Sequence, residues 1–371
     1  MPEGKKQTPV FVTRSFLPPL DTYLDCVRDI FNSHWLTNQG QYSIRLEQSL
    51  TEFLQVPNLT LCANGTLGLQ LAIRLLGLNG KKVITTPFTY VATLSSLLWE
   101  GCTPVFADID PGSLCIDPHQ VERLIAEHPD VAGILPVHVY GNACDVDALE
   151  NLSRKNGLRL LYDAAHAFGS TLRGKSLFTW GDAAVASFHA TKLFHTVEGG
   201  CVITPNAPDK EQLTLLQAFG HAGDVHKCLG INAKMSELHA AMGLCLLPAV
   251  QDMLARRAHL ADLYDTALDM GESSGLRRPV LATGLEWNRG YYPVIFPDHD
   301  TLIRIMCALK ECDIHPRRYF YPSLSQLPYV QGASCPVAED MAERVLCLPF
   351  WPGMEPQLIE KIAQIVRQNI H

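Results

Sequence analysis

The sequence predicts an α/β protein in which a mostly parallel sheet is flanked by helices and followed by a smaller α+β unit. Short apolar strands alternate with helices between residues 59 and 204. These strands show little alternation of apolar and polar residues, which is typical of a parallel sheet buried on both faces. The alternation stops after Gly230, and helices dominate the remainder. We therefore predict a large domain over residues 1–249 and a small C-terminal domain over residues 250–371.

The composition of the chain argues against nucleic-acid-binding and membrane-spanning proteins. The chain has 371 residues, of which 47% are hydrophobic and 18% charged, and a net charge of −8. Such a length is sufficient for a large core. The acidic balance and the lack of a basic block argue against nucleic acid as a partner, and no apolar run reaches the length of a membrane span. The twelve cysteines form no C-x-x-C pair and the start of the chain has no apolar signal core, so we expect reduced thiols, a cytoplasmic location and no metal site.

Hydrophobic spacing predicts each element in turn. Two amphipathic helices are expected at residues 20–31 and 46–54, with a loop at 35–40 between them. The alternating part has expected strands at 59–62, 83–86, 104–107, 131–137, 158–162, 183–188 and 201–204, and expected helices at 67–76, 91–99, 119–126 and 146–155. Beyond it we expect helices at 235–247, 248–268, 301–312, 337–345 and 356–368, and one strand at 291–296.

Chemically distinctive residues follow several of these strands, at the sheet edge where open α/β proteins bind ligands. Asn64-Gly65-Thr66 precedes an apolar helix, where backbone N–H groups and a hydroxyl can bind an anion, although Thr66 could equally be a helix cap. Tyr90 follows the next strand and could stack on a planar ligand or pack in the core. Asp163 ends a later strand, before two alanines and His166.

Lys192 lies in the stretch Ser187–Gly200, with no charged neighbour before Glu198. Taken alone, it is most simply a lysine with a buried stem and a solvated amine. A lysine among apolar residues can also have a lowered pKa, and its neutral amine can form an imine with a carbonyl. Together with Asp163, Tyr90, Thr66 and Ser187, Lys192 completes the set of groups that a pyridoxal 5′-phosphate site requires.

The chain resembles the DegT/DnrJ/StrS sugar aminotransferases, which have the aspartate-aminotransferase-type fold. The matching segments lie mostly in the first 245 residues. They are Trp35-Leu36-Thr37 with Gly40, Asn64-Gly65-Thr66, Thr86–Thr93, Phe106–Asp110, Val137–Gly141, Asp163–Gly169, Ser187–Lys192 with Glu198-Gly199-Gly200, and Gly230–Glu237, with a weaker match around Arg318–Pro322.

The resemblance implies a role for each matching position. Lys192 would bond covalently to the cofactor and move the proton, and Asp163 would keep the ring nitrogen protonated. The remaining implied cofactor contacts are Gly65, Thr66 and Ser187 at the phosphate, Tyr90 over the ring, His166 near the ring hydroxyl, and Asn232 reaching the phosphate of a neighbouring subunit. This implies a homodimer. Candidates for contacting a nucleotide-sugar are Trp35, Thr37, His189, Arg318, Tyr319 and Tyr321.

The resemblance also implies the reaction. An amino group would pass from L-glutamate to C4 of dTDP-4-keto-6-deoxy-D-glucose, a step in making deoxyamino sugars such as those of O-antigen lipopolysaccharide. Amination at C3 of a dTDP-3-keto-6-deoxyhexose and GDP-perosamine synthesis remain alternatives. A sister group of dehydratases has histidine in place of the lysine, so Lys192 favours transamination. A non-enzymatic ligand sensor on the same fold is a further alternative, which the intact Lys192 and Asp163 disfavour.

Overall fold

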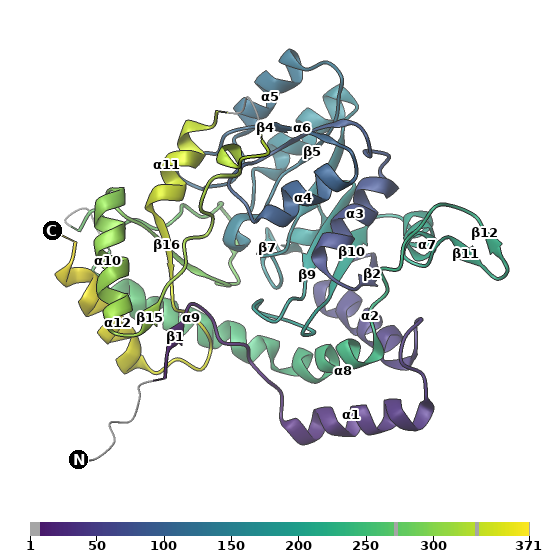
Figure 1. The fold of residues 1–371 in the computed structure, drawn as a ribbon, viewed down its shortest axis with the longest axis horizontal. Helices are drawn as coiled ribbons and strands as arrows, with labels where there is room; N and C mark the ends of the chain where they lie inside the picture. The colour runs from purple at the N-terminus through teal and green to yellow at the C-terminus, as the bar shows by residue number, and fades with distance from the viewer. Residues whose placement is uncertain (1–7, 271–273, 331–333, 371) are drawn as a thin grey trace.

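The computed structural model describes residues 8–270, 274–330 and 334–370. Its centre is a seven-stranded sheet in the order β2-β10-β9-β6-β5-β3-β4, flanked by helices (Figure 1). The strands are β2 (Asn58–Cys62), β3 (Lys82–Thr85), β4 (Thr103–Phe106), β5 (Val131–Leu135), β6 (Arg159–Asp163), β9 (Ala183–Ser187) and β10 (Gly200–Thr204). Only β10 runs antiparallel to its neighbours in this sheet. The predicted mostly parallel α/β sheet is confirmed.

Helices connect the strands and cover the sheet. They are α3 (Gly65–Leu75), α4 (Val91–Trp99), α5 (Pro118–Glu127), α6 (Val146–Asn156) and α7 (Ala207–Leu216). The hydrophobic spacing predicted the first four of them to within about three residues at each end, whereas α7 was not predicted. Five of the ten residues of α7 are polar or charged and its three leucines lie within its last four positions, so its apolar pattern is weak. It leads to a small hairpin of β11 (His221–Ala222) and β12 (Val225–His226), which projects from the body at the right of Figure 1.

Two N-terminal helices pack beneath the sheet. Helix α1 (Leu20–Ser33) lies along α8 (Glu237–Leu246), and α2 (Gln41–Leu54) packs between α8 and β2 (Figure 1). The carboxylate of Glu237 accepts hydrogen bonds from the backbone N–H groups of Tyr42 and Ser43 at 2.7 and 3.0 Å. This buried carboxylate therefore satisfies the free N-terminal donors of α2.

The C-terminal part has its own elements. Its helices are α9 (Val250–Ala267), α10 (His299–Glu311), α11 (Pro336–Arg344) and α12 (Pro356–Gln368), and its main strands are β14 (Tyr292–Ile295) and β16 (Val345–Leu348), which pair antiparallel. A buried apolar cluster extends here from Leu260 to Val366. A domain boundary at residue 250 stays a prediction. Strand β16 was not predicted: its first residue, Val345, was assigned to the end of the preceding helix, and the other three were assigned to no element.

Short strands join distant parts of the chain. Strand β1 (Val10–Phe11) pairs in parallel with β15 (Ile314–His315), and β7 (Thr171–Leu172) pairs with both β8 (Lys175–Ser176) and β13 (Leu285–Glu286). No element was predicted before residue 20, so β1 was missed. Residues 1–7 lie outside the described part of the chain.

One helical stretch, Glu237–Ala267, is long and apolar enough to cross a membrane by length and composition, with a hydropathy of 1.4. Its α8 part packs against α1 and α2, and its α9 part packs against α12. A helix packed within a fold passes the same test, so the stretch is weak support for a membrane span.

Candidate active site

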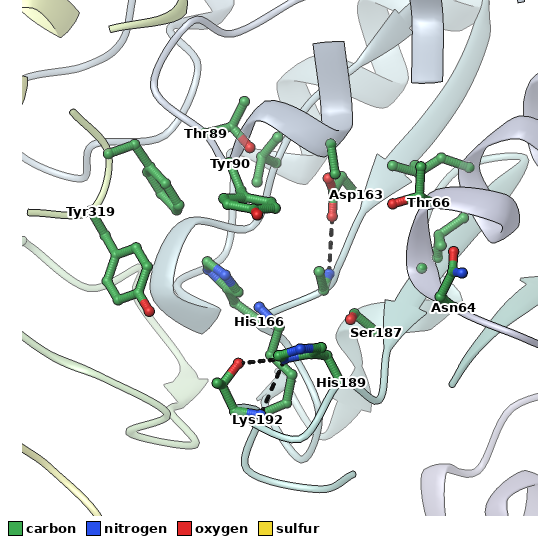
Figure 2. A pocket seen from close by; sticks show the side chains of 18 of the residues that line it. Asn64, Thr66, Thr89, Tyr90, Asp163, His166, Ser187, His189, Lys192 and Tyr319 are labelled. Carbon is green, nitrogen blue, oxygen red and sulfur yellow. Dashed lines mark hydrogen bonds between the residues drawn. The ribbon is translucent and has the colours of Figure 1, made fainter. Parts of the chain in front are cut away.

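The site is a cavity of about 360 Å³ at the carboxyl ends of β2, β6 and β9. It is lined by nine of the residues singled out from the sequence, and Figure 2 shows the side chains of all of them except Gly65 around it. They are Gly65, Thr66, Tyr90, Asp163, His166, Ser187, His189, Lys192 and Tyr319. The strand order explains the convergence, because strands that are neighbours or near neighbours in a sheet bring distant residues to one edge.

The N-terminus of α3 forms one end of the cavity. The side chain of Asn64 accepts a hydrogen bond from the backbone N–H of Leu67 at 2.9 Å. Asn64 is thus the cap of this helix, and Thr66, the alternative that the sequence left open, lies within the first turn. The hydroxyls of Thr66 and Ser187 line the same end of the cavity (Figure 2). Free N–H groups, two hydroxyls and a helix N-terminus suit a phosphate group.

Strand β10 supports this anion site through Gly200. Gly200 pairs with Cys62 on one side and with Ser187 on the other. A Cβ atom at Gly200 would lie 2.8 Å from the backbone nitrogen of Gly65 and from the carbonyl carbon of Asn64. The absence of a side chain therefore lets the Asn64–Gly65 turn approach the sheet closely.

Asp163 is buried at the end of β6. Its carboxylate accepts hydrogen bonds from the hydroxyl of Thr93 at 2.7 Å and from the backbone N–H of Ala165 at 3.1 Å. Burial raises the pKa of Asp163, and these two donors together with Lys192 oppose that rise. A cationic ring nitrogen would stabilise the carboxylate further.

Lys192 lies in the loop after β9, and its amine faces the cavity. Desolvation lowers the pKa of Lys192 to about 8, whereas Asp163 and Tyr90 raise it and Arg317 lowers it. With this pKa, about a tenth of the amine is neutral at pH 7, far more than for a solvated lysine, and an imine-forming lysine needs the neutral form. The amine donates a hydrogen bond to the hydroxyl of Tyr291 at 3.1 Å.

His166 is buried and neutral. Burial, followed by the nearby Lys192, lowers its pKa well below the ordinary value. Its Nδ1 atom accepts a hydrogen bond from the backbone N–H of Tyr140 at 3.2 Å. A neutral imidazole that accepts at Nδ1 carries its proton at Nε2, so His166 can donate that proton to an oxygen of a bound group.

His189 lies at the rim and belongs to a small polar group. Its Nδ1 atom is 2.8 Å from the hydroxyl of Thr191, and its Nε2 atom is 3.7 Å from the carboxylate of Glu198. Thr191 and Glu198 also line the cavity. This group presents both donors and acceptors to a polar ligand.

Five of the predicted site residues do not line this cavity: Trp35, Thr37, Asn232, Arg318 and Tyr321. Trp35 and Thr37 are exposed in the loop between α1 and α2. The guanidinium of Arg318 binds Glu343 and lies over the ring of Tyr321, with its central carbon 3.3 Å from the ring centre. Arg318 therefore already has an acidic partner outside the cavity.

Several residues that line the cavity were not predicted as site residues, among them Glu198, Tyr291 and Arg317. Arg317 is exposed, and its guanidinium carbon lies 4.9 Å from the centre of the Tyr319 ring. The adjacent Arg317 and Arg318 are indistinguishable by residue type, and Tyr291 belongs to an ordinary apolar strand pattern. No signal in the sequence singled out Tyr291 or Arg317. Thr93, by contrast, lies in the Thr86–Thr93 segment and could have been chosen.

The residues present fit pyridoxal 5′-phosphate. An anion site, a buried carboxylate, a neutral hydrogen-bond donor and an amine with a lowered pKa surround one cavity. Tyr90 stands at its mouth with 53% of its surface exposed, free to cover a flat ring. Among the described residues, no group of three or more His, Cys, Asp or Glu side chains could hold a metal ion.

The chain matches known proteins along nearly its whole length. The profile of the DegT/DnrJ/EryC1/StrS aminotransferase family matches residues 21–367. A dTDP-4-amino-4,6-dideoxy-D-glucose transaminase of Shigella dysenteriae is 37% identical over 98% of this chain and 99% of its own. A GDP-perosamine synthase of Vibrio cholerae is 30% identical over 92% and 94%. The crystal structure of DesI in the presence of its TDP-sugar product superposes with a TM-score of 0.89 and 33% identity, covering 98% of this chain and 93% of that one.

Proposed function

Because the chain belongs to the DegT/DnrJ/EryC1/StrS family of pyridoxal-phosphate-dependent aminotransferases, we propose that it transfers an amino group from L-glutamate to C4 of dTDP-4-keto-6-deoxy-D-glucose. The products would be dTDP-4-amino-4,6-dideoxy-D-glucose and 2-oxoglutarate. The choice of sugar follows the higher identity to the dTDP-sugar transaminase, 37%, than to the GDP-perosamine synthase, 30%. Such a product could serve O-antigen synthesis, and we propose a cytoplasmic location, in keeping with the biosynthetic transaminases that the chain resembles.

One observation carries the amino-transfer proposal. The amine of Lys192, with a pKa of about 8, shares a single cavity with the buried carboxylate of Asp163 and the anion site at the start of α3. When bound, pyridoxal 5′-phosphate supplies an aldehyde that condenses with amines and a ring that accepts electrons from the adjacent carbon. Lys192 would hold and release the proton at Nζ, since a base is most effective with a pKa near the working pH.

The other residues of the cavity would orient the cofactor and stabilise its charged groups. Asp163 would accept a hydrogen bond from a protonated ring nitrogen, and Thr93 fixes the carboxylate for that contact. Thr66 and Ser187 would bind the phosphate together with the N–H groups of α3. His166 would donate its Nε2 proton to the ring hydroxyl, and Tyr90 would cover the ring and exclude water.

Arg317 and the polar group at the rim are our candidates for the anionic and hydroxyl-bearing parts of the substrates. The structure gives the Arg317 guanidinium no ion pair within the described ranges, in contrast to Arg318, which pairs with Glu343. Both L-glutamate and a nucleotide diphosphate carry negative charge, and an arginine binds such groups with two parallel hydrogen bonds. His189 and Tyr319 line the cavity beside it and could contact the sugar.

We further propose a homodimer in which Asn232 completes the site of the partner subunit. Asn232 is exposed and does not line the cavity of its own chain. Leu229 and Ile231 precede it in the chain, and the backbone N–H of Phe219 donates a hydrogen bond to the carbonyl of Ile231; these three apolar side chains have exposed fractions of 76%, 38% and 47% for Leu229, Ile231 and Phe219. Apolar side chains concentrated in one exposed segment suit an interface with a second copy.

The test is direct. Purified protein with pyridoxal 5′-phosphate should be yellow, lose its visible absorbance when L-glutamate is added, and regain it with the keto sugar. NMR of the product should place the new amine at C4. An amine at C3, or turnover only with a GDP-keto sugar, would replace the proposed substrate. A yellow protein that no amino donor bleaches would support the ligand sensor instead. Light scattering with sedimentation should give the mass of a dimer.

A further inference from the structure

Tyr291 is the one residue that contacts the amine of Lys192 by a hydrogen bond within the described part of the chain. It directly precedes β14 in the C-terminal part, 99 positions from Lys192. The Nζ atom of Lys192 lies 3.1 Å from the Tyr291 hydroxyl and 5.8 Å from the centre of its ring. A residue of the C-terminal part thus reaches the group that carries the chemistry.

Aromatic packing holds the Tyr291 ring in place. Its centre lies 4.6 Å from that of His166, 5.4 Å from that of Tyr319 and 5.8 Å from that of Tyr140. Contacts of this kind favour defined tilted geometries. The hydroxyl is therefore presented to Lys192 from a ring with little freedom to turn away.

A phenol can serve both protonation states of a lysine. Its oxygen accepts a hydrogen bond from the ammonium, and its O–H donates one to the lone pair of the neutral amine. Burial raises the pKa of Tyr291, so the phenol keeps its proton. Within the described ranges, the structure gives the Tyr291 hydroxyl no other hydrogen-bonding partner that would compete for it.

We propose that Tyr291 is the positioning residue of Lys192, holding Nζ in one place through the gain and loss of its proton whenever the lysine is not bonded to the cofactor. This assignment rests on the proposed function, in which Lys192 alternates between these states. Tyr291 lies outside the sequence motifs that identified Lys192, so its contact with Nζ could not be inferred from those motifs.

The other groups that face Lys192 remain in place when the hydroxyl is removed. They are Asp163 and Tyr90, which favour the ammonium, and Arg317, which disfavours it, with the neutral His166 nearby. A Tyr291→Phe variant therefore isolates the hydroxyl. A bond to an ammonium is stronger than one to a neutral amine, so its loss should lower the pKa of Lys192.

The experiment measures capture of the cofactor rather than turnover. Full-length protein freed of cofactor is mixed with pyridoxal 5′-phosphate between pH 6.5 and 9.5, and the rise in visible absorbance gives the capture rate. We expect Tyr291→Phe to capture several-fold more slowly than wild type, with a midpoint of the pH profile about half a pH unit lower. In steady state its kcat should fall with little change in KM.

Tyr292→Phe is the matched control. The Tyr292 hydroxyl binds Asp265 at 2.5 Å in the C-terminal part, away from Lys192. This variant should keep the wild-type rate and midpoint, even if its melting temperature falls. Equal behaviour of Tyr291→Phe and wild type, or equal shifts in both variants, would overturn the assignment. If wild type captures no cofactor through Lys192, shown by a Lys192→Ala comparison, the proposed function itself fails, and this assignment with it.

Discussion

The cavity has two walls that are built in different ways. The sheet wall consists of Gly65, Thr66, Asp163 and Ser187, placed by the ends of strands and the start of a helix. The outer wall consists of Tyr291, Arg317, Tyr319 and Phe320, supplied by the C-terminal part of the chain. Backbone ladders fix the first wall, as in the pairing of Gly200 with both Cys62 and Ser187. Ring contacts fix much of the second, since Phe320 stacks on Tyr140 at 5.8 Å and on His166 at 5.7 Å.

Because the two walls are built differently, we expect them to have different functions. Residues on a hydrogen-bonded sheet edge hold the reacting groups in an unvarying geometry, which chemistry needs. Side chains held by other side chains can differ between relatives without disturbing the sheet. We therefore expect the sheet wall and Lys192 to control the chemical step and the outer wall to control substrate affinity and the position of the lysine.

Replacing Lys192 tests the distinction most severely. Lys192→Ala should lower kcat by about 10⁴-fold or more, because both the covalent bond and the proton transfer depend on Nζ. Turnover is measured by 2-oxoglutarate release, and cofactor retention by absorbance after gel filtration. Lys175→Ala, a surface substitution over Trp180, is the control. Substantial turnover by Lys192→Ala would remove the lysine from its assigned role.

The Asp163→Asn substitution keeps the shape of the side chain and an oxygen that accepts from Thr93, but removes the negative charge of the carboxylate. We expect kcat to fall by about 10²- to 10³-fold, the usual cost of losing one preorganised electrostatic partner. The variant should still bind the cofactor covalently, so its absorbance spectrum separates binding from chemistry. A kcat within a few-fold of wild type would show that the carboxylate does not act on the ring nitrogen.

Substitutions at the two adjacent arginines, Arg317 and Arg318, test whether a residue must line the cavity to affect substrate affinity. Arg317→Gln should raise KM for an anionic substrate by about 10- to 100-fold, because a charge-assisted hydrogen bond is lost, with a smaller change in kcat. Arg318→Gln should have a much smaller effect on KM, since its guanidinium is paired with Glu343. The reverse ranking would restore Arg318 to the role that the sequence suggested.

The pH profile is the mildest test. The pKa of Lys192 is about 8 in the folded chain, lowered mainly by desolvation. Only the neutral amine captures the cofactor, so the capture rate should rise with pH and level off above about pH 8.5, roughly tenfold above its value at pH 7. Stopped-flow absorbance measures this rate. A rate still rising steeply at pH 10 would mean that the amine keeps the ordinary pKa of a solvated lysine.

The sheet wall could be read from the sequence to a large extent. Asp163 and Ser187 end apolar strands, and Gly65 opens an apolar helix, so chain position alone places them at one edge of a parallel sheet. The same reasoning predicted the α/β class and most helices. It left open whether Thr66 binds an anion or caps α3, because a hydroxyl at a helix N-terminus can do either, and the cap in the structure is Asn64.

The sequence by itself determined the fold class and the residues that strand ends align, and it singled out Lys192 as the lysine proposed to form the imine. Short-range hydrophobic patterns encode the elements, and parallel strands share an edge. Only the tertiary structure decided which of Arg317 and Arg318 faces the cavity, and that Tyr291 reaches Lys192 across 99 positions. Those contacts depend on how the C-terminal part packs on the sheet and on which way each side chain turns, and neither has a local pattern in the chain. Lys192 thus has a hydrogen-bonding partner 99 positions away in the chain.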